Sequence, residues 1–315
     1  MTTEQNPPAS REGLVVTSHG ATVQVEDESG QLWSCDLRRK VSKVVCGDRV
    51  AWEQVGEDAG VVVERLPRSS LLARPLASGR TRPVAANVSR IILVLAPEPA
   101  FHLRQLDGYL AGIEHQALNC CLFLNKTDLL GDSQRARLEQ QLALYADIGY
   151  VVLSGSAKTD HGMDELDQHL NGQCTVLVGQ SGVGKSSLIR HLAGEKQITV
   201  GSLSAATGLG RHTTSATTIY RLPCGGHIID SPGIREFAAW PLRAGELGRG
   251  FVEFRAHLDQ CRFRDCRHVD EPDCALQTAV DPGSTAPSRL DTYAARMAER
   301  AIDPARRKRR KNPAS

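Results

Sequence analysis

The stretch Gly179-Gln180-Ser181-Gly182-Val183-Gly184-Lys185-Ser186 lies between an apolar run that ends at Val178 and a helical pattern that begins at Ser187. A strand, a glycine-rich turn and a helix, in this order, are the context that a P-loop requires. Glycines let backbone N–H groups turn toward phosphates, and the helix N-terminus adds the positive end of its dipole. We expect Lys185 to place its charge on the β- and γ-phosphates and Ser186 to bind Mg²⁺. With Ser187, the stretch predicts an α/β fold that binds a nucleoside triphosphate.

Two further segments fit the phosphate end of such a site. Asp230-Ser231-Pro232-Gly233 follows the apolar run His227–Ile229. Asp230 is expected to hold the Mg²⁺ shell through water, and the Gly233 N–H is expected to reach the γ-phosphate. Between the two motifs, the polar loop 208–215 contains Thr213 and Thr214. Either threonine can complete the Mg²⁺ shell while the γ-phosphate is present, and we favour Thr214.

The base-reading motif comes earlier in the chain. Asn125-Lys126-Thr127-Asp128 follows the apolar run Cys120–Leu124, and Ser156-Ala157-Lys158 follows the next one. The Asp128 carboxylate can accept the N1–H and the amino group of guanine, whereas adenine presents no such donor pair. Leaving that carboxylate unpaired penalises ATP, which makes the discrimination steep. The segment 156–158 is expected to give a backbone N–H to the guanine oxygen, so the ligand is GTP or GDP.

The order of these motifs predicts a circular permutation. In Ras-like GTPases the P-loop comes first, but here segments 125–128 and 156–158 precede segment 179–186. A parallel sheet tolerates this order when the usual termini lie close together and are joined. The segment after Gly233 then leads directly into the C-terminal region.

The usual water-orienting glutamine is missing. Ile234 follows Gly233, so we expect slow intrinsic hydrolysis that rises when a partner supplies or positions the missing group. His212 is the candidate catalytic residue within the chain. The alternative is an ordinary solvent-facing loop histidine.

The rest of the chain predicts a multi-domain protein. Short alternating strands in 1–66 fit a five-stranded OB-type barrel, although an SH3-like barrel would give a similar pattern. The Pro/Arg/Ser-rich stretch 67–87 is interpreted as a linker. Apolar strands alternate with helices in 88–245, which predicts a doubly wound GTPase domain. Residues 246–315 are expected to form a zinc-binding helix and loop domain with a basic tail.

A cysteine and histidine cluster supports the zinc assignment. Cys261, Cys266, His268 and Cys274 lie within one short segment. Three thiolates and one imidazole make a closed set of four ligands, which suits one structural Zn²⁺ per chain. His257 is a lesser candidate ligand.

Composition and charge indicate the class of partner. The chain has 315 residues with a formal net charge of +2 and no apolar run long enough to span a bilayer. Arginines without acidic neighbours occupy positions 68, 74, 80, 82 and 90, and basic residues fill 306–311. These stretches indicate a polyanionic partner, nucleic acid before membrane. The polar N-terminus is no secretory signal, so we expect a cytoplasmic protein. We also expect a monomer.

Together these motifs resemble the bacterial ribosome small-subunit-dependent GTPase A family, the circularly permuted GTPases of ribosome maturation. The resemblance rests on NKTD, SAK, GQSGVGKSSL, the GRHTT loop, DSPGIREF and the CRFRDCRH segment with its following cysteine. It implies binding to the small ribosomal subunit late in assembly, contact with its rRNA and hydrolysis stimulated by that subunit. It also implies that zinc ligands fall on the cysteine and histidine cluster and that His212 is catalytic. The rival hypothesis is a nucleotide-gated RNA-binding scaffold in which hydrolysis is incidental.

Overall fold

A computed structural model of the chain describes residues 10–19, 22–76, 80–194, 217–231, 242–280 and 285–302. The chain divides into two compact units. The first comprises Met1–Ala100, Leu118–Glu139 and Tyr150–Phe237, and the second comprises Phe101–Ala117, Gln140–Gly149 and Ala238–Ser315.

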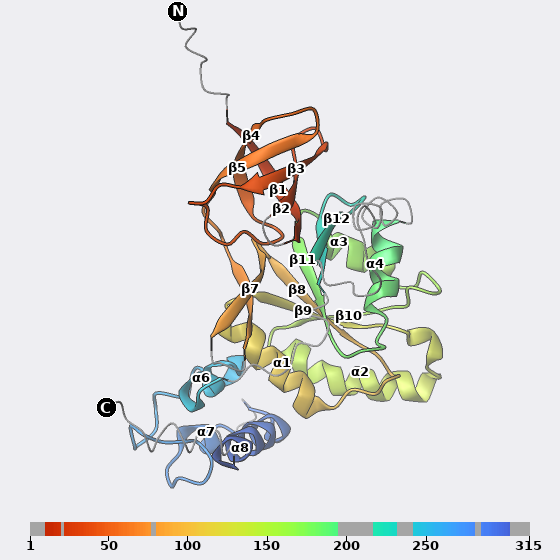
Figure 1. Cartoon of the computed structure of the whole chain (residues 1–315). Helices are drawn as coiled ribbons and strands as arrows, with labels where there is room; N and C mark the ends of the chain where they lie inside the picture. Colours follow the sequence, from red (N-terminus) through yellow and green to blue (C-terminus); the bar gives the residue numbers. More distant parts are fainter. Residues whose placement is uncertain are drawn as a thin grey trace, which may run out of the picture. The chain divides into compact units, whose positions relative to one another are not determined.

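The N-terminal part of the first unit is a closed five-stranded barrel (Figure 1, red to orange). Its strands are β1 (Arg11–His19), β2 (Thr22–Glu26), β3 (Leu32–Leu37), β4 (Arg49–Gln54) and β5 (Ala59–Arg65). The strands pair in the order β1-β2-β3-β5-β4, and β4 pairs again with β1. Only the β3–β5 pair is parallel among these ladders. This is the Greek-key closure of an OB-type barrel, so the first of the two predicted barrel types is confirmed.

Alternation along the strands explains the barrel core. In β2 and β3 every second residue is buried, because successive side chains of a strand point to opposite faces. The core gathers around Trp33 and Trp52, whose ring centroids lie 4.9 Å apart. Gly60 is required beside them, since a Cβ there would lie 2.7 Å from the Trp52 ring.

The segment predicted as a linker contains regular structure. Residues Leu71–Pro75 (β6) and Thr81–Ala86 (β7) form an antiparallel hairpin that is a separate two-stranded sheet. Arg68 precedes it and forms an ion pair with the fully buried Asp48 at 2.7 Å. Ionised side chains therefore fix this connection to the barrel, which a composition rich in proline, arginine and serine did not indicate.

The remaining strands of the first unit form the predicted α/β sheet. They are β8 (Arg90–Leu95), β9 (Asn119–Leu124), β10 (Val151–Ser154), β11 (Cys174–Val178), β12 (Thr217–Arg221) and β13 (His227–Asp230). Their order is β10-β9-β8-β11-β13-β12, and all pairs are parallel except β12–β13. Helices η1 (Thr127–Leu129), α2 (Asp132–Asp147), α3 (Met163–Leu170) and α4 (Lys185–Ala193) follow or connect the strands. In such sheets the loops after the strand C-termini meet at one edge, where ligands bind.

The second unit is helical. It contains α1 (Leu103–His115), α6 (Ala244–Arg249), η2 (Val252–Phe254), α7 (Ala275–Thr278) and α8 (Pro287–Ile302), with the end of α2. Phe251 and Phe254 stack in its core with ring centroids 4.7 Å apart, and Tyr293 meets both rings edge-on at 5.9 and 5.7 Å. None of the helices in the described residues has the length and hydropathy needed to cross a membrane.

A buried ionic network lies in this helical unit. The guanidinium of Arg289 on α8 contacts Asp107 of α1 at 2.6 Å and Glu253 of η2 at 2.7 Å. Tyr145 donates its hydroxyl to the same Asp107 carboxylate at 2.6 Å. Burial and the neighbouring carboxylate raise the pKa of Tyr145, so the phenol stays neutral. The network joins two segments far apart in the sequence, α1 and α8.

Candidate nucleotide site and metal centre

The glycine-rich stretch between β11 and α4 has the backbone that its sequence predicted. Gly179, Gly182 and Gly184 adopt φ angles of 149°, 86° and 97°, a region that other residues rarely enter. Lys185 starts α4, is buried, and donates from Nζ to the carbonyls of Gly179 at 2.6 Å and Gln180 at 2.5 Å. The lysine ammonium is thus held over the turn. Exposed Ser181, Ser186 and Ser187 lie on the same turn and first helical residues.

The structure brings segment 125–128 directly against this turn. Asn125 donates from Nδ2 to the Val183 carbonyl at 2.9 Å, 58 positions away in the sequence. Lys126 donates from Nζ to the carbonyl of Gly182 at 2.6 Å and to that of Glu98 at 2.8 Å. Two predicted motifs from separate stretches therefore share one site at the edge of the sheet.

Asp128 lies where segments 125–128 and 156–158 meet. Its Oδ1 accepts a hydrogen bond from Ser156 Oγ at 2.6 Å, and Lys158 Nζ lies 3.8 Å from Oδ2. The hydrogen bond from Ser156 is the main cause that lowers the pKa of Asp128. The backbone N–H of Ala157 donates to Asn125 Oδ1 at 3.4 Å. Thr127 is buried below them. An ionised carboxylate in this position can accept the two donors of a guanine edge.

The structure describes only some of the residues that are predicted to bind the phosphates and Mg²⁺. Asp230 is the last residue of β13, next to β11, and therefore lies at the same edge of the sheet as the glycine-rich turn. His212, Thr213, Thr214 and Gly233 lie outside the described residues, so their expected roles remain predictions.

The four predicted zinc ligands converge. The ligand atoms of Cys261, Cys266, His268 and Cys274 all lie within 4.8 Å of one another. Cys261 Sγ lies 3.3 Å from His268 Nδ1 and 3.9 Å from Cys274 Sγ. A tetrahedral site with metal–sulfur bonds of about 2.3 Å needs ligand separations of about 3.5–3.8 Å, so the cluster can hold a metal ion.

The loop around the cluster is organised by one acid. Glu271 accepts backbone N–H bonds from Arg267 and Val269, both at 3.0 Å, and from Asp270 at 3.3 Å. Burial opposes ionisation, yet these donors keep the pKa of Glu271 below its usual value. The loop backbone is therefore ordered by a carboxylate outside the ligand set, which the ligand spacing alone did not reveal.

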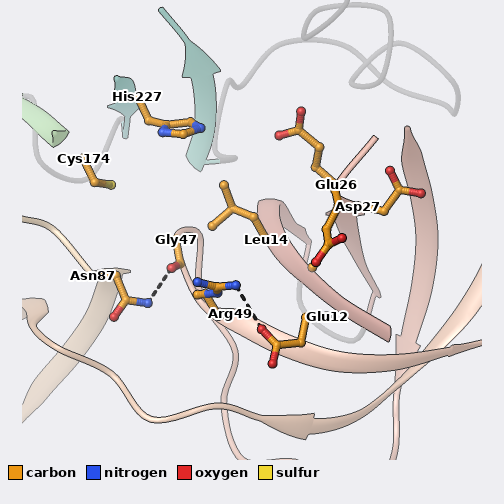
Figure 2. Close-up of a pocket in the computed structure, with 11 residues that line it drawn as sticks. Glu12, Leu14, Glu26, Asp27, Gly47, Arg49, Asn87, Cys174 and His227 are labelled. Atoms are coloured by element: carbon orange, nitrogen blue, oxygen red, sulfur yellow. Dashed lines mark hydrogen bonds and ion pairs between the residues drawn. The ribbon is translucent and has the colours of Figure 1, made fainter. Parts of the chain in front are cut away.

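A cavity of about 300 Å³ opens at the opposite end of the α/β sheet from the glycine-rich turn, because the first residues of β11 and β13 line it. Figure 2 shows its lining residues. Cys174 and His227, at the beginnings of β11 and β13, face it from the sheet. Leu14, Glu26 and Arg49 face it from the barrel strands. The sequence motifs did not point to this cavity, and it shares no residue with the predicted nucleotide site.

Comparison with known proteins gives consistent matches. The family model described as RsgA GTPase matches residues 65–240. The protein of Azotobacter vinelandii called "Small ribosomal subunit biogenesis GTPase RsgA" is 46% identical over 285 residues, which cover 89% of this chain and 83% of that protein. A protein of the same name from Chromohalobacter salexigens is 47% identical over 287 residues, covering 90% and 84%.

Solved structures show the same architecture. YjeQ from Thermotoga maritima has a TM-score of 0.77 and 31% identity, and the match covers 94% of this chain and 100% of that one. YloQ, described as a circularly permuted GTPase, has a TM-score of 0.74 and 26% identity, with 98% of each chain covered. The predicted permuted GTPase fold is confirmed by these matches together with the motif order. The chain belongs to the RsgA family of GTPases.

Proposed function

We propose that this chain is a GTP hydrolase that binds the small ribosomal subunit and assists its late maturation. Its intrinsic hydrolysis is slow and the subunit stimulates it. The observation that carries the nucleotide part is the bond from Asn125 to Val183, because it joins the guanine-reading segment to the glycine-rich turn. The names of its relatives support the ribosomal part.

In this proposal different residues of the chain bind the base, the phosphates and the Mg²⁺ of GTP. Asp128 reads the guanine edge, and Lys185 neutralises the β- and γ-phosphates once it leaves its carbonyl partners. Ser186, Asp230 and one threonine of the 208–215 loop would hold Mg²⁺, which supplies charge neutralisation at the phosphates when bound. Ile234 cannot orient a water, so the group that does so is His212 or is supplied by the partner.

The metal in the cysteine and histidine cluster is assigned as one structural Zn²⁺. The donor set of three sulfurs and one nitrogen favours zinc over oxygen-preferring ions. The four side chains would fill all four coordination positions of the metal, so no position would be open to water or substrate. It would hold the loop that carries Arg262, Phe263 and Arg267 in a fixed conformation.

The hairpin β6–β7 supports an RNA partner. Arg74 on β6 is the direct Cα partner of Arg82 on β7, and Arg80 precedes β7. Like charges directly opposite each other destabilise a hairpin unless an anion lies against them. In the described part of the chain, these three arginines have no ion-pair partner. In this proposal an rRNA backbone supplies the anions. The proposed role on ribosomal subunits also supports a cytoplasmic location.

GTP turnover with and without purified small ribosomal subunits tests the proposal. We expect turnover to rise by at least about 10-fold with subunits, since supplying a missing water-orienting group is worth that much or more. Lys185→Ala should abolish turnover in both conditions. Absence of stimulation, combined with tighter subunit binding under a GTP analogue than under GDP, would favour the scaffold hypothesis instead.

A further inference from the structure

Strand β12 lies between β13 and the barrel strand β1. It begins at Thr217, just after the threonine loop predicted at 208–215, and it runs beside β13, which ends at Asp230. On its other edge it pairs with β1 of the barrel. Thr218 is the Cα partner of both Thr17 on β1 and Asp230 on β13. One row of residues thus crosses from the barrel to the predicted Mg²⁺-binding aspartate.

The side chain of Thr217 adds a second connection in the same place. Its Oγ1 donates a hydrogen bond to Ser231 Oγ at 3.0 Å. Ser231 directly follows Asp230 and is only 4% exposed. The backbone of Thr217 is meanwhile paired with Ser18 of the barrel. Thr217 is therefore hydrogen-bonded to Ser231 and paired with Ser18 of the barrel, and it follows the threonine loop closely in sequence.

The link between barrel and sheet is narrow. The described pairing of β1 with β12 consists of two Cα partners, Thr17 with Thr218 and Ser18 with Thr217. At the other end of β12, Arg221 Nη2 forms an ion pair with Glu26 Oε1 of the barrel at 3.0 Å. A shift of β12 can thus pass to β1 through two defined contacts.

We propose that Thr217 is a positioning residue that holds Asp230-Ser231 in register with β12 and passes the nucleotide state to the barrel. The inference rests on the proposed GTP function, because γ-phosphate and Mg²⁺ order the loops of such enzymes. The GTP state stabilises the Thr217–Ser231 contact and the β12–β1 pairs that continue it. The GDP state loosens both. The barrel, whose OB-type fold often binds oligonucleotides, is thereby regulated by the nucleotide.

Two substitutions of Thr217 distinguish the effect of its hydroxyl hydrogen bond from the effect of its side-chain packing. Thr217→Val removes the donor and keeps the shape, whereas Thr217→Ser keeps the donor. Thr175→Val is the matched control, because Thr175 is buried in β11 of the same sheet and its Oγ1 has no hydrogen-bond partner among the described residues. All variants are tested as the full chain, without ribosomes.

The first readout is the Mg²⁺ dependence of binding a non-hydrolysable GTP analogue. We expect the Mg²⁺ concentration at half-saturation to rise about 3–10-fold in Thr217→Val, the size expected for one lost hydrogen bond. Thr217→Ser and Thr175→Val should match the wild type. Affinity for GDP without Mg²⁺ should be unchanged in all of them, because Thr217 acts through Asp230.

The second readout is hydrogen exchange at the amides of residues 14–18, compared between GDP and the GTP analogue. In the wild type we expect slower exchange with the analogue, and Thr217→Val should lose most of this difference. The proposal is overturned if the wild type shows no difference, if Thr217→Val keeps all of it, or if Thr217→Ser behaves like Thr217→Val. Lack of stimulation by subunits would count against the proposed function alone, since neither readout uses them.

Discussion

Ser156 Oγ lies 2.6 Å from Asp128 Oδ1, although the two residues are 28 positions apart in the sequence. The same Oγ accepts the backbone N–H of Lys158 at 3.2 Å. The serine therefore fixes one oxygen of the carboxylate and favours its ionised form. A guanine edge needs such an acceptor, so the Ser156 side chain helps to prepare the site. The sequence had indicated only a backbone N–H from segment 156–158.

Replacing Ser156 with alanine should raise the pKa of Asp128 toward its ordinary value. A carboxylate with a depressed pKa supports binding above that pKa and loses the support as the pH falls through it. The variant should therefore lose GDP affinity at a higher pH than the wild type, and affinity at neutral pH should drop about 3–10-fold. Fluorescent-GDP titrations over a pH series measure both. Ser133→Ala, on the exposed start of α2, is the control; identical pH profiles for Ser156→Ala and wild type would contradict this account.

The candidate nucleotide motifs could be located in the sequence because each one is local. Asn125 and Gly179 directly follow buried apolar strands, and the C-terminal ends of parallel strands meet at one edge. The OB-type barrel was predicted with an SH3-like barrel as the alternative, because the distinction depends on β3 pairing parallel with β5 across more than 20 intervening residues. The hairpin at 71–86 was missed because its strands are short and rich in residues typical of linkers.

The buried network around Arg289 was also beyond sequence reasoning. Its partner Asp107 is 182 positions away, and no local pattern marks either residue. In the sequence, the three charged residues of this helical core resemble ordinary surface positions, because only the fold brings them together. Gly108 gives a second example, since a Cβ there would meet the Arg296 guanidinium at 1.8 Å.

Arg289→Met should destabilise the helical unit strongly. The arginine is 1% exposed and neutralises Asp107 and Glu253, and its removal leaves two buried carboxylates without a cation. Breaking a buried ion pair on one side costs about 3–5 kcal/mol. Urea denaturation monitored by circular dichroism should show the loss. The triple variant Arg289→Met, Asp107→Leu, Glu253→Met should recover most of it, and an unchanged midpoint for the single variant would contradict a stabilising role.

The metal content of the protein should be one zinc per chain. Cys274→Ser should lower it to near zero and loosen the loop around Glu271, because a three-ligand remainder binds Zn²⁺ far more weakly. Elemental analysis of the purified protein measures this directly. Cys120→Ser, which lies on β9 outside the cluster, should keep full zinc content. Equal zinc content in both variants would show that the metal is not held by this cluster.

The arginines of the hairpin should contribute to subunit binding through charge. Arg74→Gln combined with Arg82→Gln should weaken binding to small subunits and lower the slope of log affinity against log salt by about 1–2. Arg49→Gln is the control, because Arg49 is already paired with Glu12 at 2.9 Å on the barrel. Co-sedimentation over a salt series gives the slopes. A double variant with the wild-type slope would remove the hairpin from the proposed RNA contact.

The central claim is that one pocket combines Asp128 from an early stretch with Lys185 from a later one. Competition binding of GTP, XTP and ATP to wild type and Asp128→Asn tests it most directly, because asparagine offers a donor that suits the second carbonyl of xanthine and cannot accept both guanine donors. We predict that the variant loses GTP affinity by at least about 100-fold and binds XTP in its place, which also shows that it is folded. Unchanged preference for GTP in Asp128→Asn would contradict the account.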